Sequence, residues 1–114
     1  MPSAVHALFL AAMRKQRPVA CTYQGHPREI CPVMLGRTGL EEKALVFQFG
    51  GSTSRGPIGK PDWKCFKLDE VQDARLIDGK WHSGSEHSEA QHCMKMTEYD
   101  VNPHSPYSPA FNLK

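Results

Sequence analysis

The chain has 114 residues, and its 14 Lys and Arg against 12 Asp and Glu leave a net charge of +2. A chain of this length folds as a rule around one core and buries about two thirds of its unfolded surface. The small net charge excludes the strong overall basicity of a protein that coats nucleic acid. No apolar run approaches the ~18 residues that a membrane-spanning helix requires, so we expect no membrane partner.

The first predicted element is a helix that ends before Pro18. Its apolar residues follow the i, i+3, i+4 spacing of one helical face: Val5, Leu8, Phe9, Ala12 and Met13. Ser3 is the predicted N-cap, because its hydroxyl can accept a hydrogen bond from an early backbone N–H. Basic residues follow this apolar run instead of preceding it, which argues against a signal peptide.

After Pro18 the apolar residues alternate with a period of two, which is typical of half-buried strands. Five strands are predicted, at 19–23, 28–35, 44–49, 63–68 and 74–77. A last, peripheral strand is predicted at 93–101, with a short helix as the alternative. One helix followed by about five short antiparallel strands predicts a mainly β fold, a small SH3-like or Sm-like barrel. Residues 1–82 would form this domain, and 83–114 a polar extension that contains His and Pro.

The register of the first hairpin depends on the length of its loop. A loop of residues 25–27 would place Val19 opposite Val33 and Cys21 opposite Cys31, on the core side. A loop of two residues would shift the register and separate the two thiols.

The four cysteines contain no Cys-x-x-Cys pair, so zinc ribbons and redox-active dithiols lack support in the sequence. All but Cys93 lie in apolar, strand-like surroundings. We therefore expect buried free thiols in a reducing, cytoplasmic compartment, with disulfides as the less favoured alternative. Cys31 or Cys65 could act as a nucleophile with His26, but no motif supports this pairing, so an enzyme is not expected.

The order of these segments resembles the WYL domain, a small Sm-like barrel found in bacterial regulators. The resemblance covers roughly residues 4–80 and rests on the segments 12–17, 19–23, 28–32, 35–38, 45–48 and 63–71. The Trp-Tyr-Leu signature of the family is replaced by Lys43-Ala44-Leu45, so only the leucine is retained.

The resemblance implies a domain that senses ligands, often nucleotides or nucleic-acid fragments, through basic residues on one face of the barrel. Such domains commonly follow a helix-turn-helix and take part in transcription regulation. A single helix precedes the predicted barrel here, which is too little for a helix-turn-helix.

The charge is unevenly distributed along the chain. Residues 1–67 hold ten basic and four acidic residues, a net charge of +6, whereas residues 68–114 hold four and eight, a net charge of −4. A molecule polarised in this way can present a positive face to phosphates. The alternative is that the barrel mixes the two segments in space and the field averages out.

Basic and aromatic residues on or beside the predicted strands are the candidate ligand-binding or nucleic-acid-binding residues: Arg28, Arg37, Lys64, Lys67 and Trp63. Arg grips a phosphate or carboxylate with two parallel hydrogen bonds, Lys offers a point charge, and Trp63 could stack on a base. Tyr23 could also stack, but its place on the core face favours packing.

The glycine-rich segment 50–56 could cradle an anion with its backbone N–H groups, although a flexible connector is favoured and the ending of a P-loop is missing. His82, His87 and His92 recur every five residues beside Cys93, which matches no metal-binding spacing. We expect neither a metal nor a cofactor.

The sequence thus predicts a non-catalytic ligand-sensing or accessory regulatory module that binds a small anionic ligand or single-stranded nucleic acid. The alternative is a protein-interaction module that uses a strand edge and the C-terminal tail.

Overall fold

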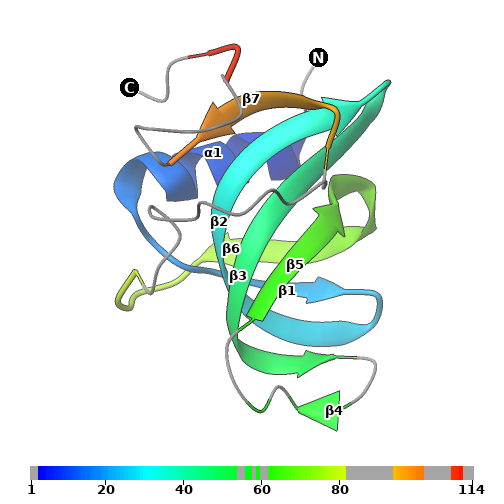
Figure 1. The fold of residues 1–114 in the computed structure, drawn as a ribbon. Helices are drawn as coiled ribbons and strands as arrows, with labels where there is room; N and C mark the ends of the chain where they lie inside the picture. The colour runs from blue at the N-terminus through cyan, green and yellow to red at the C-terminus, as the bar shows by residue number, and fades with distance from the viewer. Residues whose placement is uncertain are drawn as a thin grey trace.

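The computed structural model describes residues 3–53, 56–57, 59, 62–81, 94–101 and 109–111. Its elements in chain order are α1 (Ala4–Lys15), β1 (Val19–Tyr23), β2 (His26–Thr38), β3 (Glu41–Thr53), β4 (Gly56–Pro57), β5 (Asp62–Lys67), the 3₁₀ turn η1 (Leu68–Glu70), β6 (Val71–Leu76) and β7 (Met96–Asp100). Strands β5, β3, β2, β1 and β6 form a curled antiparallel half-barrel, and β4 and β7 add to β3 and β2 (Figure 1). The predicted mainly β fold, a small antiparallel barrel with one N-terminal helix, is confirmed.

Helix α1 begins and ends as its sequence predicts. The Ser3 hydroxyl accepts a hydrogen bond from the backbone N–H of His6 at 3.2 Å, and Gln16 closes the other end in a left-handed conformation with φ of 51°. Pro18 follows and cannot continue the helix. The apolar face of α1 packs against β2 and β6. None of the helices in the described residues is long and apolar enough to cross a membrane.

The first hairpin turns on two residues, Gln24 and Gly25, and not on three. Both have positive φ, 53° and 80°, as a tight hairpin turn of the primed type requires. Val19 therefore pairs with Ile30 and Cys21 with Arg28. Of the two alternatives left open by the sequence, the two-residue loop describes the observed register, and the pairing of Cys21 with Cys31 that a three-residue loop would give is not formed.

Strand β3 is longer than predicted and includes part of the glycine-rich segment. Gly50 and Gly51 continue its pairing with β2, and Ser52 and Thr53 pair with β4. A Cβ atom on Gly51 would lie 2.3 Å from the carbonyl oxygen of Pro27, so only glycine permits this close approach. The described part of the predicted connector is therefore extended sheet.

The core consists of two clusters on the two faces of β2 and β3. The larger lies inside the half-barrel under α1 and includes Phe9, Met13, Ile30, Val46 and Phe66. The smaller contains Val33, Met34 and Leu45, with both tryptophans packed against it. The predicted last strand is observed as β7, which pairs with β2 and buries three polar residues: Thr97, Glu98 and Asp100.

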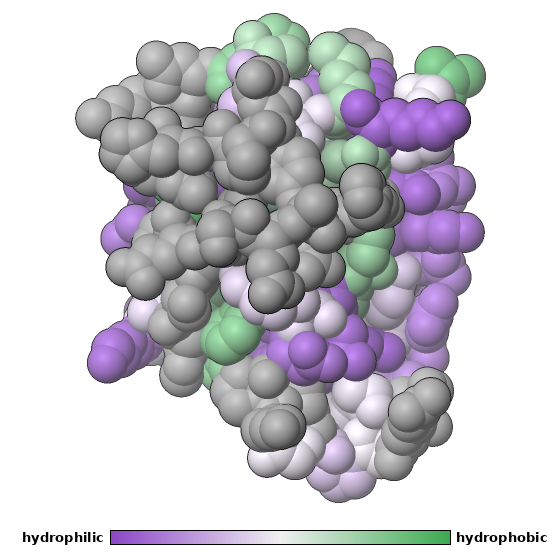
Figure 2. Space-filling model, viewed as in Figure 1, coloured by the Kyte–Doolittle hydropathy of each residue, from purple (hydrophilic) through white to green (hydrophobic). Residues whose placement is uncertain are grey.

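The surface is mixed in polarity. In Figure 2, hydrophilic residues follow one side of the molecule, and the visible hydrophobic residues form small separate areas. The large hydrophobic residues exposed within the described ranges are Leu40, at the tip of the β2–β3 hairpin, Met96 and Phe111.

The cysteines differ in state. Cys21 and Cys31 are buried free thiols, as predicted. Cys65 instead is exposed on β5 and is disulfide-bonded. The prediction of a buried free thiol is wrong for Cys65 because its position in β5 points away from the core that buries Phe66.

Candidate anion-binding site

A pocket of about 440 Å³ lies at one end of the half-barrel, where the β1–β2 turn, the end of β3 and strand β5 meet. The residues that line it are Tyr23, Gln24, Arg28, Thr53, Lys64, Cys65 and Phe66. Polar and aromatic side chains from four segments of the chain thus converge on one cavity.

Arg28 is the buried cation of this pocket, with 6% of its surface exposed. Its Nη1 donates a hydrogen bond to Oε1 of Gln48 at 3.3 Å, and its guanidinium carbon lies 5.1 Å from the centre of the Tyr23 ring. The Nε atom of Arg28 is buried and makes no hydrogen bond. Gln48 is itself fully buried and immobilised, because its Nε2 donates to the carbonyl oxygens of Gly50 and Ser52 at 3.0 and 3.2 Å.

The charge of Arg28 is not neutralised by a carboxylate among the described residues, where its only polar partner is the amide of Gln48. Burial accordingly lowers the pKa of Arg28, since the charged form loses its solvation. Cys21 lies opposite Arg28 in the sheet, and burial raises the pKa of its thiol to about 11 although Arg28 and Arg75 oppose the shift. A thiol with this pKa is protonated at neutral pH and leaves the arginine charge unbalanced.

Tyr23 and Phe66 form the aromatic wall beside Arg28. Their rings are stacked, with centroids 3.9 Å apart and planes 2° from parallel. The Tyr23 hydroxyl accepts a hydrogen bond from the backbone N–H of Lys67 at 2.9 Å, which leaves its own proton available to another acceptor. Burial raises the pKa of Tyr23, so the hydroxyl remains a donor at neutral pH. The predicted packing role of Tyr23 is confirmed by its 5% exposure.

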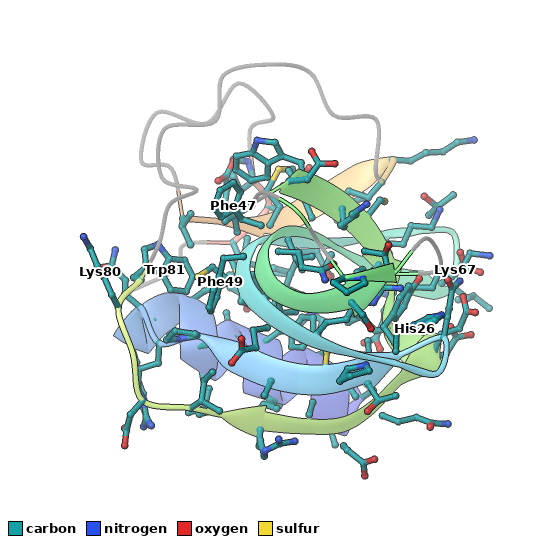
Figure 3. The ribbon with its side chains drawn as sticks, turned by 90° about the horizontal axis from the view of Figure 1, so that it is seen from below. His26, Phe47, Phe49, Lys67, Lys80 and Trp81 are labelled. Atoms are coloured by element: carbon teal, nitrogen blue, oxygen red, sulfur yellow. The ribbon has the colours of Figure 1, made fainter. Side chains whose placement is uncertain are left out.

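The rim of the pocket carries charges of both signs. Lys64 Nζ lies 3.8 Å from Oδ2 of Asp62, and Gln24 donates to Oε1 of Glu70 at 3.4 Å. Figure 3 shows Lys67 and His26 together on one side of the barrel, and Phe47, Phe49 and Trp81 on the other. The polar pocket and the aromatic outer face are therefore separate features of the molecule.

The pocket brings together only two of the five predicted site residues, Arg28 and Lys64. Lys67 adjoins it through its backbone bond to Tyr23. Arg37 lies elsewhere, because its Nη2 pairs with Oε2 of buried Glu98 at 3.0 Å. Trp63 packs edge-on against Phe47, with centroids 5.1 Å apart, and belongs to the smaller core cluster.

Gln48 and Phe66 also belong to the site, although neither was among the predicted site residues. Gln48 carries a readable signal: it continues the inward-facing series of Ala44 and Val46, and a polar side chain there needs a buried partner. The less favoured alternative for 50–56, an anion cradle of backbone N–H groups, is not observed in its described part, because Gly50 and Ser52 turn carbonyl oxygens, not N–H groups, toward Gln48.

A second polar cluster connects α1, β2 and β7. His6 Nε2 lies 3.3 Å from Oε1 of Glu98, whose other oxygen holds Arg37. The described part of the chain contains no group of three or more His, Cys, Asp or Glu that could hold a metal ion. The histidines at 82, 87 and 92 lie outside it.

Comparison of the chain with protein-family models, with curated proteins and with solved structures finds no match. The resemblance to the WYL domain therefore stays a prediction.

Proposed function

We propose that the protein binds a small anionic ligand in the Arg28 pocket, without turnover, as a sensing or accessory regulatory module. The observation that carries this proposal is the buried guanidinium of Arg28, whose only polar partner among the described residues is a neutral amide. A buried charge without a counter-charge is costly, and a ligand that supplies the counter-charge recovers part of that cost on binding.

A small ligand is favoured over single-stranded nucleic acid. Nucleic-acid binding requires a row of cations with exposed aromatic rings between them. Arg37 is engaged by Glu98, and Trp63 packs in the outer core cluster, so neither extends the pocket into a groove. A cavity of about 440 Å³ falls within the range of small-molecule sites.

The proposal is tested with three simple anions that share one ring: benzoate, benzenesulfonate and phenyl phosphate. Titration calorimetry at low salt should detect binding of at least one anion, and the affinity should fall as sodium chloride is added. Arg28→Met should weaken that binding at least tenfold, while Lys15→Met, which removes an exposed cation from α1, should leave it unchanged.

Two results would overturn the proposal. One is the absence of binding by all three anions. The other is equal affinity in the Arg28→Met variant and in the unchanged protein, since binding would then occur away from the pocket. Circular dichroism of each variant verifies that it is folded, so that a loss of binding is assigned to the charge.

A further inference from the structure

The positive charges of the lysines around the Arg28 pocket are offset by neighbouring carboxylates. Lys64 at the rim is already paired with the carboxylate of Asp62 at 3.8 Å, on the same strand two residues earlier. Asp62 also accepts a hydrogen bond from the backbone N–H of Trp63 at 2.8 Å, which holds its carboxylate at the start of β5. Lys64 therefore adds little net positive charge to the pocket.

A second pair of opposite charges, Lys67 and Glu70, acts on Tyr23, which forms the other wall of the pocket. The charges of Lys67 and Glu70 both reach the Tyr23 hydroxyl, where Lys67 lowers the pKa and Glu70 raises it. The carboxylate of Glu70 is held near the pocket by its hydrogen bond from Gln24, a lining residue. Among the described residues, the carboxylates of Asp62 and Glu70 thus offset the charges of Lys64 and Lys67, and Arg28 is the cation of the pocket without a carboxylate partner.

From this balance we infer that the pocket selects a singly charged anionic group, a carboxylate, over the dianion of a phosphate monoester. This inference rests on the proposed function. One negative charge neutralises Arg28, whereas a second would face the carboxylates of Asp62 and Glu70 in a partly desolvated cavity. The Tyr23 hydroxyl has a proton to donate to the second carboxylate oxygen, and the stacked rings offer an apolar wall to the body of the ligand.

Phenyl phosphate tests the inference, because its charge changes with pH. Its second ionisation falls near the value of about 6 that is typical of phosphate monoesters, so the group is mainly a monoanion at pH 5 and a dianion at pH 8. Benzenesulfonate stays a monoanion throughout and serves as the reference for changes in the charge of the protein itself. The affinity ratio of phenyl phosphate to benzenesulfonate should fall at least threefold from pH 5 to pH 8.

Asp62→Asn provides a second, independent test. The asparagine oxygen can still accept the Trp63 N–H bond, but Lys64 loses its counter-charge. At pH 8 the affinity for phenyl phosphate relative to benzenesulfonate should be at least threefold higher in Asp62→Asn than in the unchanged protein. Asp73→Asn is the matched control, because this exposed residue of β6 does not line the pocket and asparagine tolerates its positive φ of 53°. It should leave the ratio unchanged.

The outcomes separate this inference from the proposed function. If none of the anions binds, or if they bind Arg28→Met as tightly as the unchanged protein, the proposed function fails and the inference fails with it. If benzenesulfonate and benzoate bind through Arg28 but the ratio stays level or rises toward pH 8, only the charge selectivity is overturned. A ratio in Asp62→Asn that matches Asp73→Asn would equally contradict the role assigned to the Lys64–Asp62 pair.

Discussion

Replacement of Arg28 by methionine should stabilise the free protein while it weakens anion binding at least tenfold. A buried charge that lacks a counter-ion costs about 3–5 kcal/mol of folding free energy. Arg28 meets that description, with 6% exposure and an amide as its only polar partner in the described part of the chain. Methionine removes the charge, keeps much of the apolar stem and retains a sulfur that packs well beside aromatic rings.

Two losses oppose this gain. The guanidinium lies 5.1 and 5.5 Å from the ring centres of Tyr23 and Phe66, and these cation–π contacts contribute about 1–2 kcal/mol. Oε1 of Gln48 loses its hydrogen bond, at a cost of about 1 kcal/mol, because water in the adjoining pocket can replace the donor. The balance is a stabilisation of about 0–3 kcal/mol, and its midpoint of about 1.5 kcal/mol corresponds to a rise in Tm of about 6 °C.

Urea unfolding measures the difference in free energy of unfolding between Arg28→Met and the unchanged protein. The buffer must contain no oxyanions, because a bound anion would stabilise the unchanged protein and hide this difference. The midpoint should rise in Arg28→Met with an unchanged slope. Arg28→Lys is the matched variant: it keeps the charge, loses the planar group that lies over the rings, and should lower the midpoint. A fall in the midpoint for Arg28→Met would refute the reasoning, because it would mean that the fold already balances the charge.

Three further predictions concern neighbouring groups. Gln48→Glu places a carboxylate 3.3 Å from the Arg28 guanidinium and should weaken benzoate binding at least tenfold; calorimetry that finds unchanged affinity would contradict this. The pKa of the Cys21 thiol is about 11 in the folded protein and 9.0 in the unfolded chain, so stability should fall by about 2 kcal/mol from pH 9 to 11, and less in Cys21→Ala. If urea unfolding finds the same loss of stability between pH 9 and 11 in Cys21→Ala as in the unchanged protein, this prediction is wrong. Glu98→Gln removes the counter-charge of partly exposed Arg37 and should destabilise by about 2 kcal/mol, with benzoate affinity unaffected.

The order and type of the elements could be predicted because the periodicity of the apolar residues changes clearly at Pro18. The helix cap and the observed strands follow from that pattern. The length of β3 could not be predicted in the same way. Gly50 and Gly51 are typical of a loop, and only the close approach of β3 to Pro27 in the folded sheet explains glycines within a strand.

The site was harder to predict than the fold. Residue type alone singles out every cation near a strand, but it does not say which cation already has a partner. The charge of Arg37 is paired with Glu98, which is distant in sequence and reaches it only because β7 pairs with β2. Lys64 has its partner two residues away, yet the sequence does not show that this pair lies at the rim of a pocket.

The chemistry of the pocket depends on one local feature, the two-residue turn at Gln24 and Gly25. Side chains alternate between the faces of a strand, so a register that differs by an odd number of residues exchanges the two faces. With a three-residue turn, Cys21 would face Cys31, and Arg28 would lie on the outer face of β2 in solvent. The observed turn instead places Arg28 opposite Cys21, which belongs to the inner core. The left-handed φ angles of the turn therefore bury a charge that no carboxylate among the described residues balances, and this unbalanced charge is the reason to expect an anionic ligand.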